Sequence, residues 1–190
     1  MSNSCIVTYT GKFIDPLNLK PEDVDIRDIA HALSNLCRYG GHTRHFYSVA
    51  QHSVILADEV RHRLGDEQAF FALLHDAEEA YVVDLPRPLK NTMQLAHYQT
   101  ICQKVSVAIF KRFDVDLPLG DYVTVMNLDK EMVLHEANRI MEKPLEWRRQ
   151  ELDAIQPTFS PIIEFMTPHR AEHLFLETFG KLCFALDKHV

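Results

Sequence analysis

The sequence predicts an all-α domain of about six helices with a small N-terminal β-hairpin. Apolar residues recur at helical spacing along most of the chain beyond Pro16, and helix-capping residues precede several of these stretches. Only residues 5–14 are rich in β-forming residues. A chain of 190 residues fits one domain. We therefore expect a single domain, 1–190, with the hairpin in 1–20, a helical core in 25–142 and a C-terminal helical part in 143–190.

The N-terminal elements follow from local patterns. The stretch "CIVTYTGKFI" has Thr10-Gly11 at its centre, which is typical of a hairpin. Asp25 can cap a following helix, whose apolar stripe comprises Ile26, Ile29, Ala30 and Leu33. The next segment, "RYGGHTRHFY", holds two glycines and many polar groups, so we expect a loop.

Two helices are predicted next. Ser48 and Gln51 have the spacing of a capping box, and Gly65 ends the helix they open. One face of this helix carries Val49, His52, Ser53, Leu56, Val60 and Leu64. Asp66 is expected to cap the second helix, which runs to about Val82 and turns inward Phe70, Leu73, Leu74 and Ala77.

The remaining chain is also predicted to be helical. Pro86 and Pro88 break the preceding helix, and further helices are expected over about 93–112 and 119–142. The first has the stripe Leu95, Ile101, Val105 and Ile109, and the second Val125, Met132, Val133 and Ile140, with Asp129 and Glu136 on nearly the same side. Residues 144–161 read as irregular or partly helical. Thr167 and Pro168 open a last helix with the stripe Leu174, Phe175, Phe179 and Leu182.

Composition excludes several classes of function. The formal net charge is -7 and no block of Lys and Arg stands out, which argues against nucleic-acid binding. The four cysteines form no CxxC pair, so neither a zinc finger nor a disulfide framework is indicated. The N-terminus lacks the pattern of a signal peptide, and no run approaches the ~20 apolar residues of a membrane span. We expect a cytoplasmic protein without a membrane partner.

One set of residues points to chemistry. His52 and Asp129 lie on apolar helix faces, and His75 and Asp76 are adjacent in a helix bound for the core. A single buried histidine is more often a hydrogen-bonded core residue, but a buried aspartate needs a partner. Antiparallel helices could bring all four together. Two imidazoles and two carboxylates make a mixed site that suits Fe, Mn, Co, Ni or Zn and leaves positions open for water and substrate.

These residues carry a resemblance to a known family. The order His52, His75-Asp76, Asp129 resembles the H…HD…D pattern of the HD-domain metal-dependent phosphohydrolases. The stretch "ALLHDAEEAYVVDLPRPLK" is similar to the "HDxxE…GDLPxPxK" stretch of the 5'-deoxynucleotidase branch. The stretch "CRYGGHTRHFYSVAQHS" looks like that of the branch with the phage dATP triphosphohydrolases and the oxetanocin A phosphohydrolase. The similarity spans about residues 25–140 and implies an HD-domain helical bundle.

The resemblance implies roles for the ligand set and for two acids. His52, His75, Asp76 and Asp129 would hold one divalent ion, with Co, Mn, Fe, Ni and Mg as candidates, and a second Mg on the substrate phosphates is left open. Glu79, four residues after His75, would hold or deprotonate the attacking water. Asp84 would orient the water, accept a sugar hydroxyl or cap the turn before Pro86. Glu78 we assign to a solvated face.

The resemblance also implies substrate contacts. Arg38 and Lys90 would clamp phosphates. His42 would donate to a phosphate or act as a proton source, and Thr43 and Arg44 are weaker candidates on the same loop. Tyr39 stands where the deoxynucleotidases have a tryptophan near the sugar or base. This departure favours the phage and oxetanocin-type branch.

The expected activity is hydrolysis of phosphate from adenine deoxynucleotides or their analogues. Triphosphates would be cleaved stepwise or with release of triphosphate, down to the nucleoside. Two alternatives stay open: a 5'-deoxynucleotidase acting on deoxynucleoside monophosphates, and a nucleotide-binding HD protein without turnover. A cyclic-dinucleotide phosphodiesterase ranks lower because the extra histidines of that class are absent. Relatives of this kind form dimers or hexamers, so we also expect a homo-oligomer, with the last helix as a contact.

Overall fold

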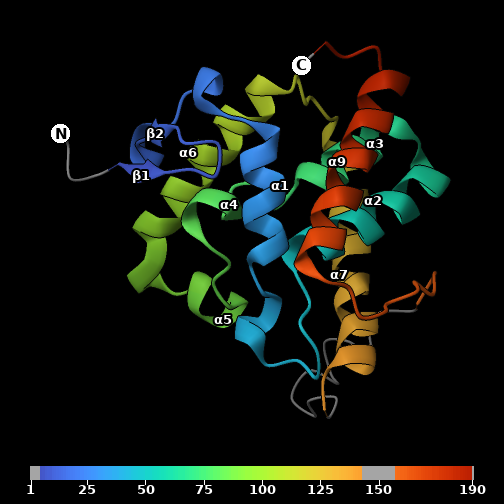
Figure 1. Cartoon of the computed structure of the whole chain (residues 1–190). Coiled ribbons are helices and arrows are strands. Elements are labelled where there is room, and N and C mark those ends of the chain that lie inside the picture. The colour runs from blue at the N-terminus through green and yellow to red at the C-terminus, as the bar shows by residue number, and fades with distance from the viewer. Residues whose placement is uncertain (1–4, 143–156, 190) are drawn as a thin grey trace.

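The computed structural model describes residues 5–142 and 157–189, and it is mostly helical with one two-stranded antiparallel sheet (Figure 1). Six helices in the described ranges have nine or more residues: α1 (Ile26–Asn35), α2 (Val49–Leu64), α3 (Asp66–Leu74), α6 (Ala96–Arg112), α7 (Leu119–Ile140) and α9 (Pro168–Ala185). Two shorter helices are α4 (Glu79–Val82) and α5 (Arg87–Lys90). The predicted mostly helical class and N-terminal hairpin are confirmed.

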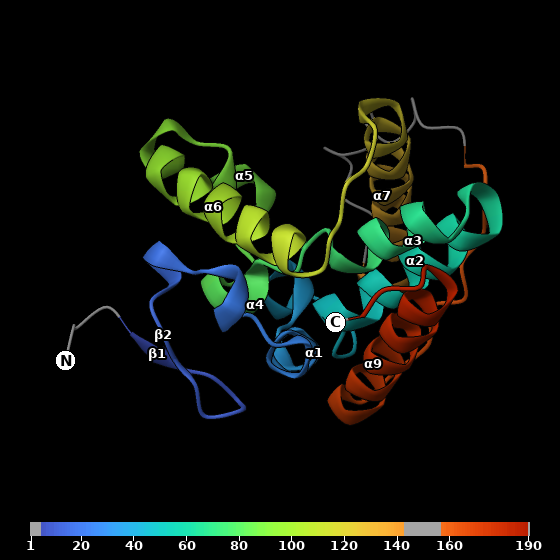
Figure 2. The same cartoon turned by 90° about the horizontal axis from the view of Figure 1, so that it is seen from above.

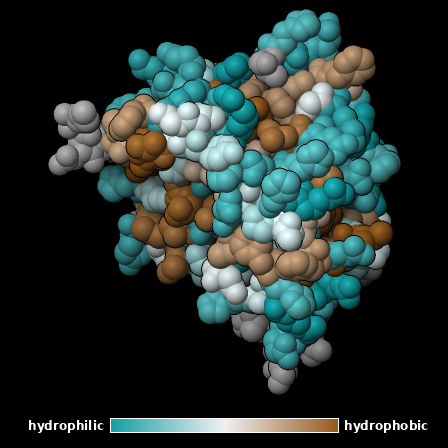
Figure 3. All heavy atoms as spheres, in the orientation of Figure 1, coloured by the Kyte–Doolittle hydropathy of each residue, from teal (hydrophilic) through white to brown (hydrophobic). Residues whose placement is uncertain are grey.

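The hairpin is formed by β1 (Ile6–Val7) and β2 (Phe13–Ile14), which pair antiparallel. Gly11 supplies the left-handed backbone of the turn at φ +84°. The hairpin is tied to α1 because the Asp28 carboxylate accepts from the Thr10 amide at 2.6 Å and from its hydroxyl at 3.0 Å. Figure 3 shows apolar side chains gathered over the hairpin, where Phe13 is exposed.

Helix α1 begins as predicted. The Asp25 carboxylate accepts from the Arg27 amide at 3.0 Å, which satisfies one of the free N–H groups of the first turn. In the expected stripe Ile29, Ala30 and Leu33 are fully buried, while Ile26 is only partly buried.

Helices α2 and α3 form an antiparallel hairpin. Ser48 caps α2 by accepting from the Gln51 amide at 3.1 Å, but the predicted capping box is only half formed. The Gln51 side chain donates instead to the Glu164 carbonyl at 2.8 Å. Gly65 ends α2 at φ +113°, and Leu64 beside it is 37% exposed, so its predicted inward position is wrong. Leu64 lies at the turn that joins α2 to α3.

The second predicted helix differs from the structure at both ends. Asp66 does not cap α3; its carboxylate accepts from Arg61 at 2.6 Å. The helix also does not run unbroken to Val82. It stops at Leu74, turns through residues 75–78 and resumes as α4. The residues predicted to point inward, Phe70, Leu73, Leu74 and Ala77, are all buried.

The later helices lie close to their predicted positions. The predicted helix over 93–112 is α6 preceded by a 3₁₀ turn, Met93–Leu95. Thr167 caps α9 by accepting from the Arg170 amide at 3.3 Å. Helix α9 packs on α1, α2 and α3 through Phe175, Phe179 and Leu182, and Figure 2 shows α6 on the other side of α1 and α4.

The segment before α9 is anchored to α7. The buried Glu131 carboxylate accepts from the Thr158 amide, from the Thr158 hydroxyl at 2.9 Å and from the Phe159 amide at 3.0 Å. Residues 157–161 contain no helix, and the rest of the predicted irregular segment, 144–156, lies outside the described residues. None of the described helices combines the length and apolar character needed to cross a bilayer.

Candidate metal centre

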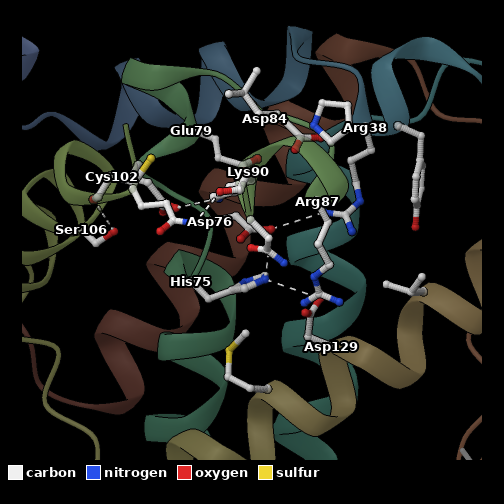
Figure 4. Close-up of a pocket in the computed structure, with 18 of the residues that line it drawn as sticks. Arg38, His75, Asp76, Glu79, Asp84, Arg87, Lys90, Cys102, Ser106 and Asp129 are labelled. Carbon is white, nitrogen blue, oxygen red and sulfur yellow. Dashed lines mark hydrogen bonds and ion pairs between the residues drawn. The ribbon is translucent and has the colours of Figure 1, made fainter. Parts of the chain in front are cut away.

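The structure brings the four predicted metal ligands together. His52 comes from the first turn of α2, His75 and Asp76 follow α3, and Asp129 comes from the middle of α7. His52 Nε2 lies 3.2 Å from Asp129 Oδ1 and 4.0 Å from Asp76 Oδ2. His75 Nε2 lies 3.1 Å from Asp76 Oδ2 and 3.8 Å from Asp129 Oδ1 (Figure 4). We call these four residues the ligand cluster.

The hydrogen bonds of the two imidazoles fix their tautomers. His75 Nδ1 lies 2.8 Å from the Ala72 carbonyl, which can only accept, so Nδ1 carries the proton. His52 Nδ1 lies 2.6 Å from the Glu136 carboxylate and donates to it in the same way. Both Nε2 atoms are buried and have no hydrogen-bond partner within residues 5–142 and 157–189. Two buried lone pairs facing carboxylates fit a divalent cation, with Glu136 and Ala72 as the outer partners.

The charges of the ligand cluster also suit the binding of a divalent cation. Burial raises the pKa of Asp129, but the neighbouring His52 and His75 imidazoles outweigh it, and the pKa lies well below the ordinary value. For Asp76 burial is likewise outweighed, here by His75 and Arg38, and its pKa is lowered. Both acids are therefore anionic. Burial lowers the pKa of His75, but the two aspartates raise it further, so a metal ion would compete with protons for Nε2.

Glu136 is a residue of the candidate site to which the sequence assigned no role. It is fully buried on α7 and accepts from four donors: His52 Nδ1, the Tyr47 hydroxyl at 2.8 Å, an Arg38 guanidinium nitrogen at 3.4 Å and the Tyr39 hydroxyl. Burial raises its pKa, but Arg38 and His52 lower it to about 2. Its position seven residues after Asp129, on the same face of the predicted helix, was the available signal.

The turn over residues 75–78 explains a wrong prediction. Its bonds run from Ala77 N to Leu74 O at 3.0 Å and from Glu79 N to Asp76 O at 3.1 Å. Such i to i+3 bonds give three residues per turn, so Asp76 and Glu79 stack on one side. Glu78 is rotated inward at the same time. It is 7% exposed, so its assignment to a solvated face is wrong.

Lys90 contacts both of these glutamates. Its Nζ lies 3.6 Å from Glu79 Oε1 and 3.7 Å from Glu78 Oε1. Burial, with repulsion from Asp76, raises the pKa of Glu79 to about 10 and that of Glu78 to about 7, although Lys90 opposes both shifts. Carboxylate oxygens of Asp76, Glu78 and Glu79 also lie within 4.8 Å of one another. Lys90 therefore lies against a group of three acids beside the ligand cluster.

Two loop residues predicted to contact the substrate, Arg38 and Tyr39, form hydrogen bonds within the protein. Arg38 is buried and donates to Asp76 at 3.3 Å as well as to Glu136. Tyr39, in the left-handed region at φ 57°, directs its hydroxyl to Glu136. Both line the cavity described next, so each borders the ligand cluster and the space in front of it.

A cavity of about 1120 Å³ opens in front of the ligand cluster. His75, Asp76 and Asp129 line it, as do the predicted residues His42, Glu79, Asp84 and Lys90. Thr43 is not in its wall and donates to the His45 carbonyl at 2.6 Å, while Arg44 binds the Glu142 carbonyl at 3.1 Å. An apolar wall from α3, α6 and α7 comprises Phe71, Val107, Phe110, Tyr122, Met126 and Val133.

Comparison with known proteins places the chain in a family. The uncharacterized protein YfdR of Escherichia coli K12 is 33% identical over 190 residues, which cover 94% of this chain and 96% of that protein. This chain belongs to the YfdR family. The uncharacterized protein RCAP_rcc00048 of Rhodobacter capsulatus is 34% identical over 110 residues, 55% of each chain. No family model matches the sequence.

Proposed function

We propose that this member of the YfdR family is an HD-type, metal-dependent nucleotide phosphohydrolase. The observation that carries the proposal is the pair of buried Nε2 atoms of His52 and His75, which face two ionised aspartates while each Nδ1 is bound elsewhere. Structural packing alone gives no reason to leave two buried imidazole nitrogens unpartnered, since such atoms normally find a hydrogen bond.

The ligand cluster would hold one divalent ion, with Co, Mn, Fe, Ni or Mg as candidates for this mixed nitrogen and oxygen set. A divalent ion bound there would activate a water molecule and withdraw charge from a phosphoryl oxygen. Arg38 holds Asp76 and Glu136 in place, and Glu136 holds the His52 ring. The chain thus orients the ligands from behind through residues that do not themselves bind the ion.

Glu79 is the residue that we propose takes the proton of the attacking water. It is 5% exposed, lines the cavity and lies on the Asp76 side of the turn. Its raised pKa reflects burial and neighbouring acids, and a cation nearby would favour the carboxylate form that a base needs. Asp84 lines the same cavity, and burial raises its pKa, which suits a group that hydrogen-bonds a sugar hydroxyl.

Adenine deoxynucleotides or their analogues are the substrates we propose first. The apolar wall on α6 and α7 suits a base, and the ligand cluster suits a phosphate. Two alternatives are a 5'-deoxynucleotidase acting on monophosphates and a nucleotide-binding protein without turnover. A homo-oligomer is also proposed. The apolar stripe of α9 is buried within the chain, so a contact there would use its outer side, where Phe184 is exposed.

The test is product analysis by chromatography. The purified protein receives dATP, dAMP and ATP with Co, Mn or Mg in turn. Nucleoside plus triphosphate from dATP would make it a triphosphohydrolase, whereas stepwise diphosphate, monophosphate and free phosphate would indicate sequential removal. Turnover of dAMP alone would support the nucleotidase. If no metal yields any product, the protein is not a hydrolase of these nucleotides, and binding without turnover becomes the better explanation.

A further inference from the structure

The cavity wall carries three basic side chains: Arg38, Arg87 and Lys90. Two of them already have carboxyl partners. Arg38 forms ion pairs with Asp76 and Glu136, and Lys90 lies within 4 Å of two glutamates. Among the described residues of the wall, Arg87 is the arginine or lysine that has no carboxyl partner.

Arg87 differs from the other two in its surroundings. It is exposed, and it forms no ion pair and no side-chain hydrogen bond with residues 5–142 or 157–189. Figure 4 shows Arg87 and Arg38 on one side of the His75-Asp76 pair, while Cys102 and Ser106 of α6 lie on the other. A substrate with its base against α6 and a phosphate at the ligand cluster would extend further phosphates toward Arg87.

The backbone at Arg87 is held in place, although its side chain has no polar partner among the described residues. Pro86 and Pro88 restrict the chain on both sides, and the Pro86 carbonyl accepts from the amides of Leu89 at 2.8 Å and Lys90 at 3.0 Å. The Gln99 side chain ties this turn to α6 by donating to the Lys90 carbonyl. Because the backbone that carries this guanidinium is already fixed, the side chain can bind a phosphate with little additional ordering of the backbone.

The size of the cavity fits a long substrate. Its volume of about 1120 Å³ exceeds the roughly 300–1,000 Å³ of most small-molecule sites, so a monophosphate would leave much of it empty. We propose that Arg87 binds the β- and γ-phosphates of a nucleoside triphosphate and makes triphosphates the preferred ligands over monophosphates. This inference rests on the proposed function and narrows its substrate class. The planar fork of arginine suits paired contacts to phosphate oxygens.

The experiment compares dATP and dAMP binding by calorimetry in the presence of Mn. Glu79→Gln protein serves as the background, so that neither nucleotide is consumed. Adding Arg87→Ala should weaken dATP binding by about 10- to 100-fold, the loss expected for charge-assisted hydrogen bonds, and change dAMP binding by less than about twofold. The dATP affinity of Arg87→Lys should lie between those of the Arg87 and Arg87→Ala proteins, because lysine keeps the charge and loses the planar fork.

The matched control is Arg170→Ala, which removes an exposed arginine from α9 outside the cavity wall. It should leave binding of both nucleotides unchanged. Equal weakening of dATP and dAMP by Arg87→Ala, or no weakening of either, would overturn the role of Arg87 while leaving the phosphohydrolase proposal intact. Absence of any nucleotide binding to the Glu79→Gln protein is a different result, because it would remove the proposed function itself.

Discussion

Replacing Glu136 tests the support behind the ligand cluster. The carboxylate is fully buried, accepts from four side-chain donors and is an ion-pair partner of the buried Arg38. Glu136→Ala removes one of the two carboxylate partners of Arg38 and leaves three other donors without this acceptor. Removal of one member of a buried ion pair costs about 3–5 kcal/mol. Glu136→Gln keeps one acceptor oxygen and the side-chain volume, so it should cost less.

Replacement of Glu136 should also lower the affinity of the ligand cluster for a metal ion. His52 Nδ1 donates to Glu136 at 2.6 Å, and loss of such an outer partner typically weakens metal binding by about 10- to 100-fold. Glu136→Gln should therefore lower the affinity for Co or Mn by this factor, measured by competition with a chromogenic chelator.

Stability and metal affinity must be separated in this test. Urea unfolding in excess chelator gives the free energy of unfolding of the metal-free protein. Glu177→Gln is the control, since this carboxylate on α9 is exposed and forms an ion pair with Lys181 at 2.8 Å; it should change neither quantity appreciably. If Glu136→Gln binds Co and Mn as tightly as the unmodified protein, Glu136 does not orient His52, and the reasoning about the outer partner is refuted.

Three further predictions concern single residues. Asp129→Ala should abolish turnover and weaken metal binding while far-UV circular dichroism stays unchanged; retained activity would mean that the fourth ligand is another residue. Glu79→Gln should keep metal and nucleotide binding but slow hydrolysis by about 10²- to 10⁴-fold, the usual share of a general base; loss of the metal would make Glu79 a ligand. Glu131 concerns pH. Burial raises its pKa, but the Thr158 and Phe159 amides lower it below the ordinary 4.5. Its stabilising contribution is therefore present above pH 4.5 and is lost as the pH falls through the lower folded value. The stability gap between the unmodified protein and Glu131→Gln, measured by urea unfolding from pH 7 to 3, should narrow below pH 4.5; a constant gap would contradict the assignment.

The sequence was sufficient to predict the positions of most helices and the four residues that form the ligand cluster. Helical periodicity located α1, α2, α6, α7 and α9, because each has one face buried in a common core. His52 and Asp129 stood out because an ionisable group on an apolar stripe needs a partner. These signals depend on residues close together in the chain, and they are visible without coordinates.

Other features depend on contacts between distant segments. The Gln51 side chain is drawn to Glu164, 113 positions away, which no local capping rule anticipates. The inward position of Glu78 follows from the change from α to 3₁₀ geometry after Leu74, and periodicity assumes one unbroken helix there. Likewise, the pairing of Arg38 and Lys90 with internal carboxylates, which leaves Arg87 as the available cation, requires the folded arrangement.

The contact between His52 and Glu136 joins positions 84 residues apart, and the candidate ligands come from three segments of the chain. An ion held there would act as a cross-link that exists only in the fully assembled chain, since α7 must dock before the last ligand arrives. Binding and folding would then be linked by mass action. A free ion concentration of 100 times its dissociation constant would stabilise the native state by about 2.7 kcal/mol. The thermal midpoint would rise with the logarithm of that concentration, and a chelator would act on this protein as a mild denaturant.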